Sequence, residues 1–372
     1  MPPTEKHHGD RGPKPYFHGR NEIIDVFKAV LHANKPSKTG TTFLVHGAPG
    51  AGKTALLAEL CKVANRCKHA RISLTALHDP IAMAQALGQA YAVDQKASLE
   101  AGIIYVKGGI VETIAGHATP TEILKCIATK HGLILVLDEA QRLSSLEVGS
   151  QEHVRVGDTL SMIHNGHLEM PVMLLAGGLS TTLDAFASFG ITRFTRQCKP
   201  SLGGLHPHET KSVIRKFLSH EKVVPPLPKW IDAVAKQTHG WPQHIIAYAS
   251  LLANHLSSIN PDMSDTGLDS VLRAVREEQI AYYQERFRGI FLGERHAMAK
   301  LFAKKPIGTD MDPEWIIDGL TESYSEEKAT ALFTRALDRG IIDIQGDGYC
   351  RIPIPSLRSF LIDTYGREQD IP

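Results

Sequence analysis

The sequence is poor in the features that mark secreted, membrane-spanning or strongly charged proteins. Its 372 residues include only five cysteines, an odd number at irregular spacing, and this suits reduced thiols better than a disulfide framework. No run of eighteen apolar residues occurs, and the first twenty residues hold no apolar segment. We therefore expect no membrane span, no signal peptide and a cytoplasmic location.

The balance of charge is also uninformative about partners. The formal net charge is +1, which gives no whole-chain attraction to nucleic acids or to membranes. A hydrophobic share of 42% is typical of globular proteins, and the length leaves room for two or three domains.

Cys61, Cys67 and His69 come close together in the sequence. Helical spacing would scatter them around the axis, so we predict no metal site there.

What the sequence does contain is a glycine-rich segment, GAPGAGKT, at 47–54. It follows an apolar run at 41–46 that favours a strand and precedes a run at 53–66 that favours a helix. A P-loop requires this setting, because its backbone N–H groups converge on phosphates at a helix N-terminus. The alternative, a glycine-rich turn without a ligand, is disfavoured by the same setting. The segment predicts binding of a nucleoside triphosphate.

Within this Walker A segment, each residue type has an expected role. Lys53 would place a positive charge on the β- and γ-phosphates, and Thr54 would offer its hydroxyl to Mg²⁺. The full set of residues expected to hold the nucleotide is Gly47, Gly50, Ala51, Gly52, Lys53 and Thr54.

A second motif, LILVLDE at 133–139, predicts hydrolysis. Its apolar run favours a buried parallel strand that exposes its carboxyl end. Asp138 would hold Mg²⁺ beside Thr54, and Glu139 would act as the general base on the attacking water. A core strand followed by an acidic helix cap is the alternative, which the upstream P-loop makes improbable. We interpret the pair as Walker A and Walker B motifs.

From residue 16 to about 200 the pattern alternates between strands and helices. Such alternation predicts an α/β fold with a doubly wound parallel sheet, whose ligands sit at the carboxyl ends of the strands. The expected strands lie at 41–46, 70–75, 133–138 and 171–176, and the expected helices at 53–66, 80–92, 120–131 and 154–165. The glycine-rich stretch 93–119 is interpreted as an insertion or a mobile loop.

The remainder reads as helical, with expected helices at 207–219, 228–238, 243–257 and 267–288. Three more helices, at 295–304, 313–323 and 326–338, precede a hairpin signal around 346–348. Helix–helix–helix–hairpin is the layout of a winged helix. We therefore expect a flexible segment at 1–15, a nucleotide-binding domain at 16–204, a helical lid at 205–290, a winged-helix-like domain at 291–366 and a tail at 367–372.

Together these parts resemble the AAA+ ATPases, in the branch of origin-recognition initiators, transposition regulators and signal-transduction (STAND) ATPases. The segment YFHGRNE at 16–22 is similar to the box that precedes the P-loop in that branch. The resemblance implies that Gly19 and Arg20 lie against the adenine, and so implies ATP rather than GTP. Taken alone, Gly-Arg before a helix would be only an N-terminal cap.

The same resemblance implies three further site residues. The segment 171–182 is similar to the sensor 1 strand, with Ser180 as the candidate that orients the lytic water and Thr181 as the next choice. Arg193, in preference to Arg196, stands where relatives carry an arginine finger for a neighbouring subunit, the alternative being a solvated basic turn. Gln243 stands where many relatives carry the sensor 2 arginine. Because a glutamine brings no charge, this departure favours slow turnover.

Two functions remain open from the sequence. The first is an ATP switch that self-associates and relays its nucleotide state to a partner protein. The second is an ATPase that uses its winged helix on duplex DNA, which needs a basic surface. Residues 294–372 hold ten Lys and Arg against fourteen Asp and Glu, so the switch is favoured. A helicase interpretation of DEAQ at 138–141 would need a second RecA-like domain, and the helical remainder offers none.

Overall fold

The computed structural model describes residues 14–37, 41–65, 67–90, 103–106, 109–112, 119–126, 132–168, 171–224, 226–345 and 347–366. The chain divides into two compact units. The first consists chiefly of Asn21–His46 and Lys53–Pro200, and the second of Lys14–Arg20, Gly47–Gly52 and Ser201–Pro372.

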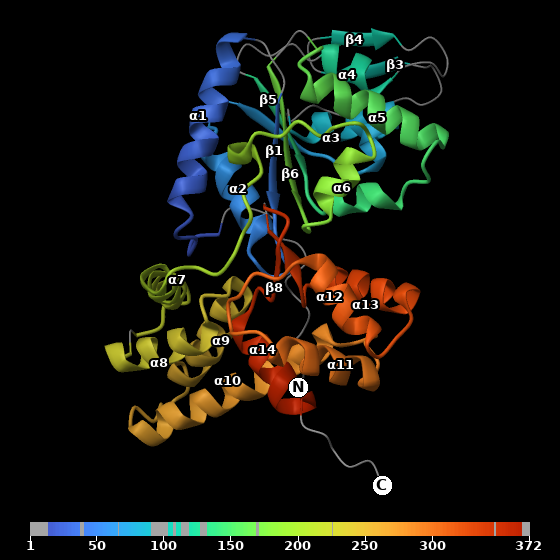
Figure 1. Ribbon diagram of the computed structural model, residues 1–372. Coiled ribbons are helices and arrows are strands. Elements are labelled where there is room, and N and C mark those ends of the chain that lie inside the picture. Colours follow the sequence, from blue (N-terminus) through green and yellow to red (C-terminus); the bar gives the residue numbers. More distant parts are fainter. Residues whose placement is uncertain are drawn as a thin grey trace. The chain divides into compact units, whose positions relative to one another are not determined.

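The first unit is built on a four-stranded sheet in which every pairing is parallel (Figure 1). Its order is β1 (Thr41–His46), β6 (Val172–Gly178), β5 (Leu133–Leu137) and β2 (Lys68–Arg71). Because parallel neighbours need crossover connections, the helices between the strands cover the sheet. The α/β fold with a parallel sheet is thus confirmed.

Helices lie on both faces of this sheet (Figure 1). On one face Phe27 of α1 packs edge-on against Phe43 of β1, with ring centroids 5.2 Å apart. The other face carries α3, α4 and α5, whose apolar residues join the strands in one core. The helical elements of the unit are α1 (Asn21–Ser37), α2 (Lys53–Val63), η1 (Thr75–Leu77), α3 (Pro80–Ala90), α4 (Pro120–Cys126), η2 (Ala140–Ser145), α5 (Gln151–His164), α6 (Thr182–Ala187) and η3 (Arg196–Cys198).

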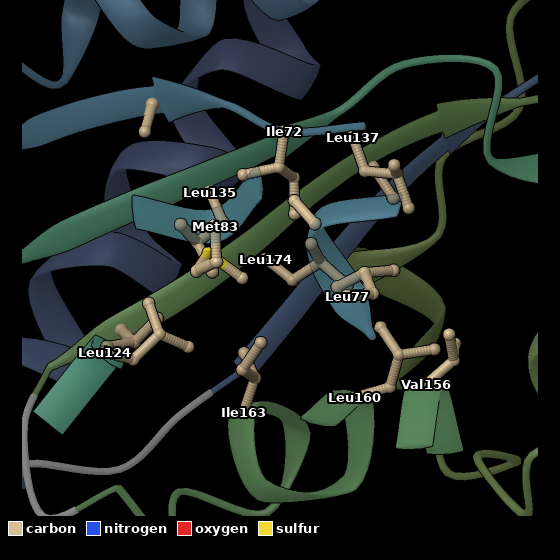
Figure 2. Close-up of a cluster of buried hydrophobic side chains, with 14 of the residues drawn as sticks. Ile72, Leu77, Met83, Leu124, Leu135, Leu137, Val156, Leu160, Ile163 and Leu174 are labelled. Atoms are coloured by element: carbon tan, nitrogen blue, oxygen red, sulfur yellow. The ribbon is translucent and has the colours of Figure 1, made fainter. Parts of the chain in front are cut away.

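Strand β5 shows why the apolar run at 133–137 is continuous rather than alternating. Leu133, Leu135 and Leu137 point into the core formed with α3 and α5 (Figure 2). Ile134 and Val136 are equally buried but do not belong to that core, because successive side chains of a strand point to opposite faces. A strand covered on both faces must be apolar throughout.

The second unit begins with four helices that share a core containing Trp230 and Tyr248, both fully buried. They are α7 (Pro207–His220), α8 (Pro228–Thr238), α9 (Pro242–Leu256) and α10 (Asp265–Arg286). Proline at the first position starts α7, α8 and α9, where its missing N–H leaves no hydrogen bond unmade.

The remainder of the second unit comprises three helices, a short antiparallel hairpin and a last helix. This reproduces the predicted order of helices and hairpin and adds α14, which the sequence analysis did not predict. The bounds are α11 (Leu292–Ala303), α12 (Pro313–Thr321), α13 (Glu326–Asp338), β7 (Asp343–Ile344), β8 (Cys350–Arg351) and α14 (Pro355–Tyr365).

Several predicted bounds differ from the observed ones. The strand expected at 70–75 is β2 at Lys68–Arg71, since the chain enters the turn of η1 soon afterwards. Helices α1, α6 and α14 were not predicted. Within 93–119, taken as an insertion or loop, β3 (Ile103–Val106) and β4 (Gly109–Glu112) form an antiparallel hairpin. Residues 1–13 of the expected flexible segment 1–15, the expected tail 367–372, and Gly346 within the hairpin signal lie outside the described residues.

No helix among the described residues is both long and apolar enough to cross a lipid bilayer.

The central strand β6 supplies a test of the core. Leu174 is fully buried in the middle of β6, among the side chains drawn in Figure 2. We expect Leu174→Ala to lower the free energy of unfolding by about 2–5 kcal/mol, because a cavity remains where the side chain was. Urea denaturation of the full chain measures the loss. Val148→Ala is the control, because Val148 is 76% exposed and its loss should stay within about 0.5 kcal/mol. Equal losses for both variants would contradict this placement of the core.

Candidate functional site

The site begins where two parallel strands end at the same edge of the sheet. Helix α2 starts at Lys53 shortly after β1, and Asp138 directly follows β5. The Thr54 hydroxyl donates to Asp138 Oδ2 at 2.8 Å, although the two residues are 84 positions apart in the sequence. The fold therefore joins the Walker A threonine to the Walker B aspartate, as the sequence predicted.

This pair fits a magnesium ion. A hydroxyl oxygen and a carboxylate oxygen in direct contact are hard oxygen ligands, and Mg²⁺ commonly takes one or two protein oxygens together with phosphate oxygens and water. Gly177 of β6 leaves room for the carboxylate, since a Cβ on that residue would lie 3.3 Å from Asp138 Oδ1. Among the described residues no group of three or more His, Cys, Asp and Glu forms a separate metal site, and Cys61 and Cys67 are buried free thiols.

The glycine-rich loop ahead of α2 has the backbone conformation that its sequence predicts. Gly50 and Gly52 have φ of 85° and 88°, values that residues with a side chain rarely adopt. Ala51 N–H donates to the Ala48 carbonyl at 3.2 Å. Lys53, at the first position of α2, is only 8% exposed. A tight loop leading into a helix N-terminus, with a buried lysine at its end, is a cradle for phosphates.

His46 closes β1 immediately before the loop and is fully buried. Burial, with smaller contributions from the nearby charges of Lys199 and Lys53, lowers the pKa of His46 to about 4. The imidazole is therefore neutral at physiological pH and adds no positive charge next to the loop.

Glu139 has an unusual backbone conformation. Its φ is 56° and its ψ 41°, in the left-handed region, and its own N–H donates to Asp138 Oδ1 at 3.1 Å. The 3₁₀ helix η2 begins at the next residue, but within the described structure the Glu139 side chain does not cap it. The carboxylate accepts a hydrogen bond from Gln141 Nε2 instead. This geometry argues against the alternative that Glu139 is merely an acidic helix cap.

Gln141 connects Glu139 to the end of β6. Its Oε1 accepts a hydrogen bond from the Leu179 N–H at 3.2 Å. Gly178 permits this approach, because a Cβ there would lie 3.0 Å from Gln141 Oε1 and 3.1 Å from Gln141 N. The two consecutive glycines at the end of β6 thus leave space for the side chains of Asp138 and Gln141. In the sequence, DEAQ at 138–141 is only the basis of the helicase alternative, and no pattern there singles out Gln141.

The predicted sensor 1 and finger residues lie in the same unit. Ser180 stands two residues beyond β6 and is buried, with 7% of its surface exposed. Arg193 is exposed in the segment between α6 and η3. The roles of Ser180 as sensor 1 and of Arg193 as the arginine finger therefore stay predictions from the sequence.

Residues 16–20 of the box at 16–22 belong to the second unit. The Arg20 N–H donates to Glu209 Oε1 at 3.2 Å, and its guanidinium donates to the Gly203 carbonyl. Burial lowers the pKa of Arg20, while Glu209 opposes that effect. Glu209 also accepts from the His206 N–H at 2.9 Å, which caps α7. Gly19 and Arg20 are therefore held on the N-terminus of α7.

The loop residues Gly47–Gly52 belong to the second unit, and helix α9 binds one of their carbonyls. The Gln243 N–H, in the first turn of α9, donates to the Gly50 carbonyl at 3.2 Å. The Gln243 side chain lies against the same glycine, where a Cβ could not fit. The predicted sensor 2 position is thus brought to the P-loop.

A second carbonyl of the loop is bound by Arg286, the last residue of α10. Arg286 is 7% exposed. Its Nη2 donates to the Pro49 carbonyl and to the Tyr282 hydroxyl, and its Nη1 donates to the Arg339 carbonyl at 2.7 Å. Arg339 is the C-cap of α13, and the following Gly340 lies against the Pro49 ring. The sequence carried no signal for Arg286, because two of its partners, the Pro49 and Arg339 carbonyls, are backbone atoms distant in the chain.

The N-terminal part of the chain is similar to a known protein family. Residues 16–149 match the profile of a family described as AAA ATPase domain. That region contains the P-loop, Asp138 and Glu139 but ends before Ser180 and Gln243. No curated protein matches the sequence.

Similar solved structures cover nearly the whole chain at low identity. A Walker-type ATPase of Pyrococcus abyssi aligns with a TM-score of 0.61 and 15% identity, covering 95% of this chain and 99% of its own. The ORC2 protein of Aeropyrum pernix aligns with a TM-score of 0.55 and 14% identity, covering 95% and 96%. A variant of RuvB from Thermotoga maritima aligns with a TM-score of 0.51 and 14% identity, covering 96% of this chain and 100% of its own. Residues 16–149 therefore match an AAA ATPase domain, and the chain has the fold of P-loop ATPases.

Proposed function

We propose that this protein is an ATP-binding and slowly ATP-hydrolysing switch of the AAA+ class, which relays its nucleotide state to a partner protein. In this proposal residues 16–204 bind the nucleotide, 205–290 form the lid and 291–366 form a winged-helix-like domain. The observation that carries the relay is the Arg286 side chain, which binds both the P-loop backbone and the end of α13.

Nucleotide binding rests on the loop and on the Thr54–Asp138 pair. The N–H groups of Gly50, Ala51 and Gly52 and the ammonium of Lys53 hold the phosphates. Thr54 and Asp138 hold Mg²⁺, which neutralises phosphate charge when it is bound. Gly19 and Arg20 are assigned to the adenine from the family resemblance.

Hydrolysis is assigned to Glu139 as general base. One proton of the attacking water passes to the Glu139 carboxylate while the water oxygen bonds to the γ-phosphorus. The bond from that phosphorus to the β,γ-bridging oxygen breaks, so that ADP and phosphate result. Ser180 is assigned to orient the water, and Arg193 of a neighbouring copy to neutralise the transition-state charge.

Slow turnover follows from the residue at the sensor 2 position. Gln243 reaches the Gly50 carbonyl through its backbone, but its side chain brings no positive charge to the phosphates. Less transition-state charge is then neutralised than with an arginine. A slow ATPase suits a switch, whose ATP-bound state must persist long enough to be recognised.

The relay rests on the geometry around Arg286. Phosphate binding requires the loop N–H groups to converge, and this constrains the peptide planes that carry the Pro49 and Gly50 carbonyls. Arg286 binds the first of these carbonyls and the Arg339 carbonyl with the same guanidinium. A change at the loop therefore changes the hydrogen bonding at the C-terminus of α13. A planar guanidinium suits this role because its donors have fixed directions.

The alternative is an ATPase that applies the winged helix to duplex DNA, which the element order α11–α13 followed by a hairpin favours. The charges oppose it. Arg335 on α13 is bound to the buried Glu294, with N and O 2.6 Å apart, and Arg351 on the hairpin is bound to Asp310 at 2.7 Å. Basic residues that pair internally contribute little to phosphate neutralisation.

Lys53→Ala tests the nucleotide site. We expect the affinity for a non-hydrolysable ATP analogue with Mg²⁺ to fall by about tenfold to a hundredfold, because a charge-assisted contact of about 1.5–3 kcal/mol is lost. Isothermal titration calorimetry measures the change. Lys62→Ala, in the last turn of the same helix, is the control, because Lys62 forms only an exposed pair with Glu59. Unchanged affinity of the Lys53 variant would place the nucleotide elsewhere.

Arg286→Lys tests the relay. We expect ATP to change hydrogen exchange at the amides of α13 in the wild-type chain, and to leave α13 unchanged in the variant. Lysine keeps the positive charge, but its ammonium group lacks the planar set of donors with which a guanidinium binds two carbonyls at once. The affinity for ATP should stay within about threefold, since no phosphate contact is removed.

Arg288→Lys is the matched control for that measurement, because Arg288 is exposed and pairs only with its helix neighbour Glu285. If α13 of the Arg286 variant still responded to ATP as in the wild type, the relay would not run through Arg286.

The two functions differ in their response to DNA. For the switch we expect duplex DNA to change ATP turnover by no more than about twofold at low salt, because the surface around α13 carries no excess of positive charge. Turnover with and without a duplex, over a series of salt concentrations, measures this. Strong stimulation that declines with added salt would replace the switch by the DNA-dependent ATPase.

A further inference from the structure

We infer that Gln141 is a positioning residue for hydrolysis, which ties the Glu139 carboxylate to the backbone at the end of β6. This inference rests on the proposed role of Glu139 as general base. It assigns a function to a residue that neither the P-loop nor the Walker B pattern includes.

The first argument concerns which way the Gln141 amide faces. The Leu179 N–H can only donate, so the amide atom 3.2 Å from it must be the oxygen Oε1. The Nε2 atom then faces Glu139 and donates to its carboxylate. The orientation of the amide is thus set by a backbone group, and Gln141 presents a donor to Glu139.

The second argument concerns what the backbone of β6 allows. Gln141 is half-buried, and its Oε1 lies in the space that a Cβ on Gly178 would enter. Gly178 has an ordinary strand partner, His46 of β1, so the glycine is not required by pairing. A Cβ there would clash first with Thr182 Oγ1 and would also crowd Gln141 Oε1 and N, so the approach of both residues requires the glycine. The end of β6 therefore contributes a vacant side-chain position beside Gln141, and Leu179, one residue beyond the strand, contributes a fixed backbone N–H.

The third argument concerns Glu139 itself. Its backbone is in the left-handed region, its side chain does not cap the backbone of η2 in the described part of the chain, and the carboxylate is exposed. An exposed glutamate has several rotamers, and a general base must lie within hydrogen-bond reach of the water it deprotonates. The Gln141 donor selects among these rotamers. Because the same amide is bound to Leu179, the position of the carboxylate follows the end of β6, next to Ser180.

The test compares Gln141→Ala with Glu139→Gln and with the wild-type chain in steady-state ATP hydrolysis. We expect Gln141→Ala to lower kcat by about tenfold to a hundredfold, the range in which a misplaced catalytic group reduces a rate. KM for ATP and the affinity for a non-hydrolysable analogue should remain within about twofold, since Gln141 is not assigned to the nucleotide.

Two further variants separate positioning from folding. Gln141→Glu keeps the size of the side chain but replaces the donor with a second carboxylate, so kcat should fall as far as in Gln141→Ala. In a Glu139→Gln background, Gln141→Ala should cause no additional loss, because residues acting as a unit are not additive. Gln151→Ala, at an exposed position of α5, is the matched control and should be indistinguishable from the wild type.

The outcomes separate this inference from the function on which it depends. If Glu139→Gln abolishes turnover while Gln141→Ala leaves kcat unchanged or raises it, Gln141 does not position the base and the inference alone is wrong. If Gln141→Ala lowered kcat by the same factor in the Glu139→Gln background as in the wild-type chain, the inference would also be wrong. If Glu139→Gln turns over normally, or if the wild-type chain does not hydrolyse ATP, the proposed hydrolysis fails and the inference fails with it.

Discussion

The parallel pairing of β1, β6 and β5 is the constraint on which the rest of the site depends. Parallel strands end at one edge of the sheet, so the residues that follow β1 and β5 must meet there. The 2.8 Å hydrogen bond between Thr54 and Asp138 is the direct result. Strand β6 separates the two and places its own carboxyl end between them. Any change of strand order would remove the site, even with every motif intact.

The end of β6 has little side-chain volume, and this allows its neighbours to approach. Gly177 lies under the Asp138 carboxylate and Gly178 under the Gln141 amide. A buried strand otherwise favours large apolar residues, which fill space and add hydrophobic stabilisation. The two glycines contribute none of that stabilisation. Because they carry no side chains, the residues around the candidate base can come within hydrogen-bond distance of the backbone at the end of β6.

The second unit holds the P-loop through the loop's carbonyl groups, whereas phosphates are bound through N–H groups. The Pro49 and Gly50 carbonyls are bound by Arg286 and by the Gln243 N–H. A peptide unit is planar, so its carbonyl cannot turn without turning the N–H of the next residue. In the proposed function, the second unit and the nucleotide would therefore act on opposite sides of the same peptides. This is the arrangement through which nucleotide binding would be coupled to helices α9, α10 and α13.

The sequence by itself determined the alternation of strands and helices, the Walker A and Walker B residues and the helical remainder, because these follow from short-range patterns of apolar residues and glycine. The helices α8 and α13 agree with their predicted bounds. Only the tertiary structure shows the contacts of Gln141, Gly178 and Arg286. Their distant partners include the Leu179 N–H and the Pro49 and Arg339 carbonyls, and every residue but proline carries both groups, so such contacts leave no pattern in a sequence. Which backbone group lies close to a given side chain is determined only when the strands pair and the helices pack.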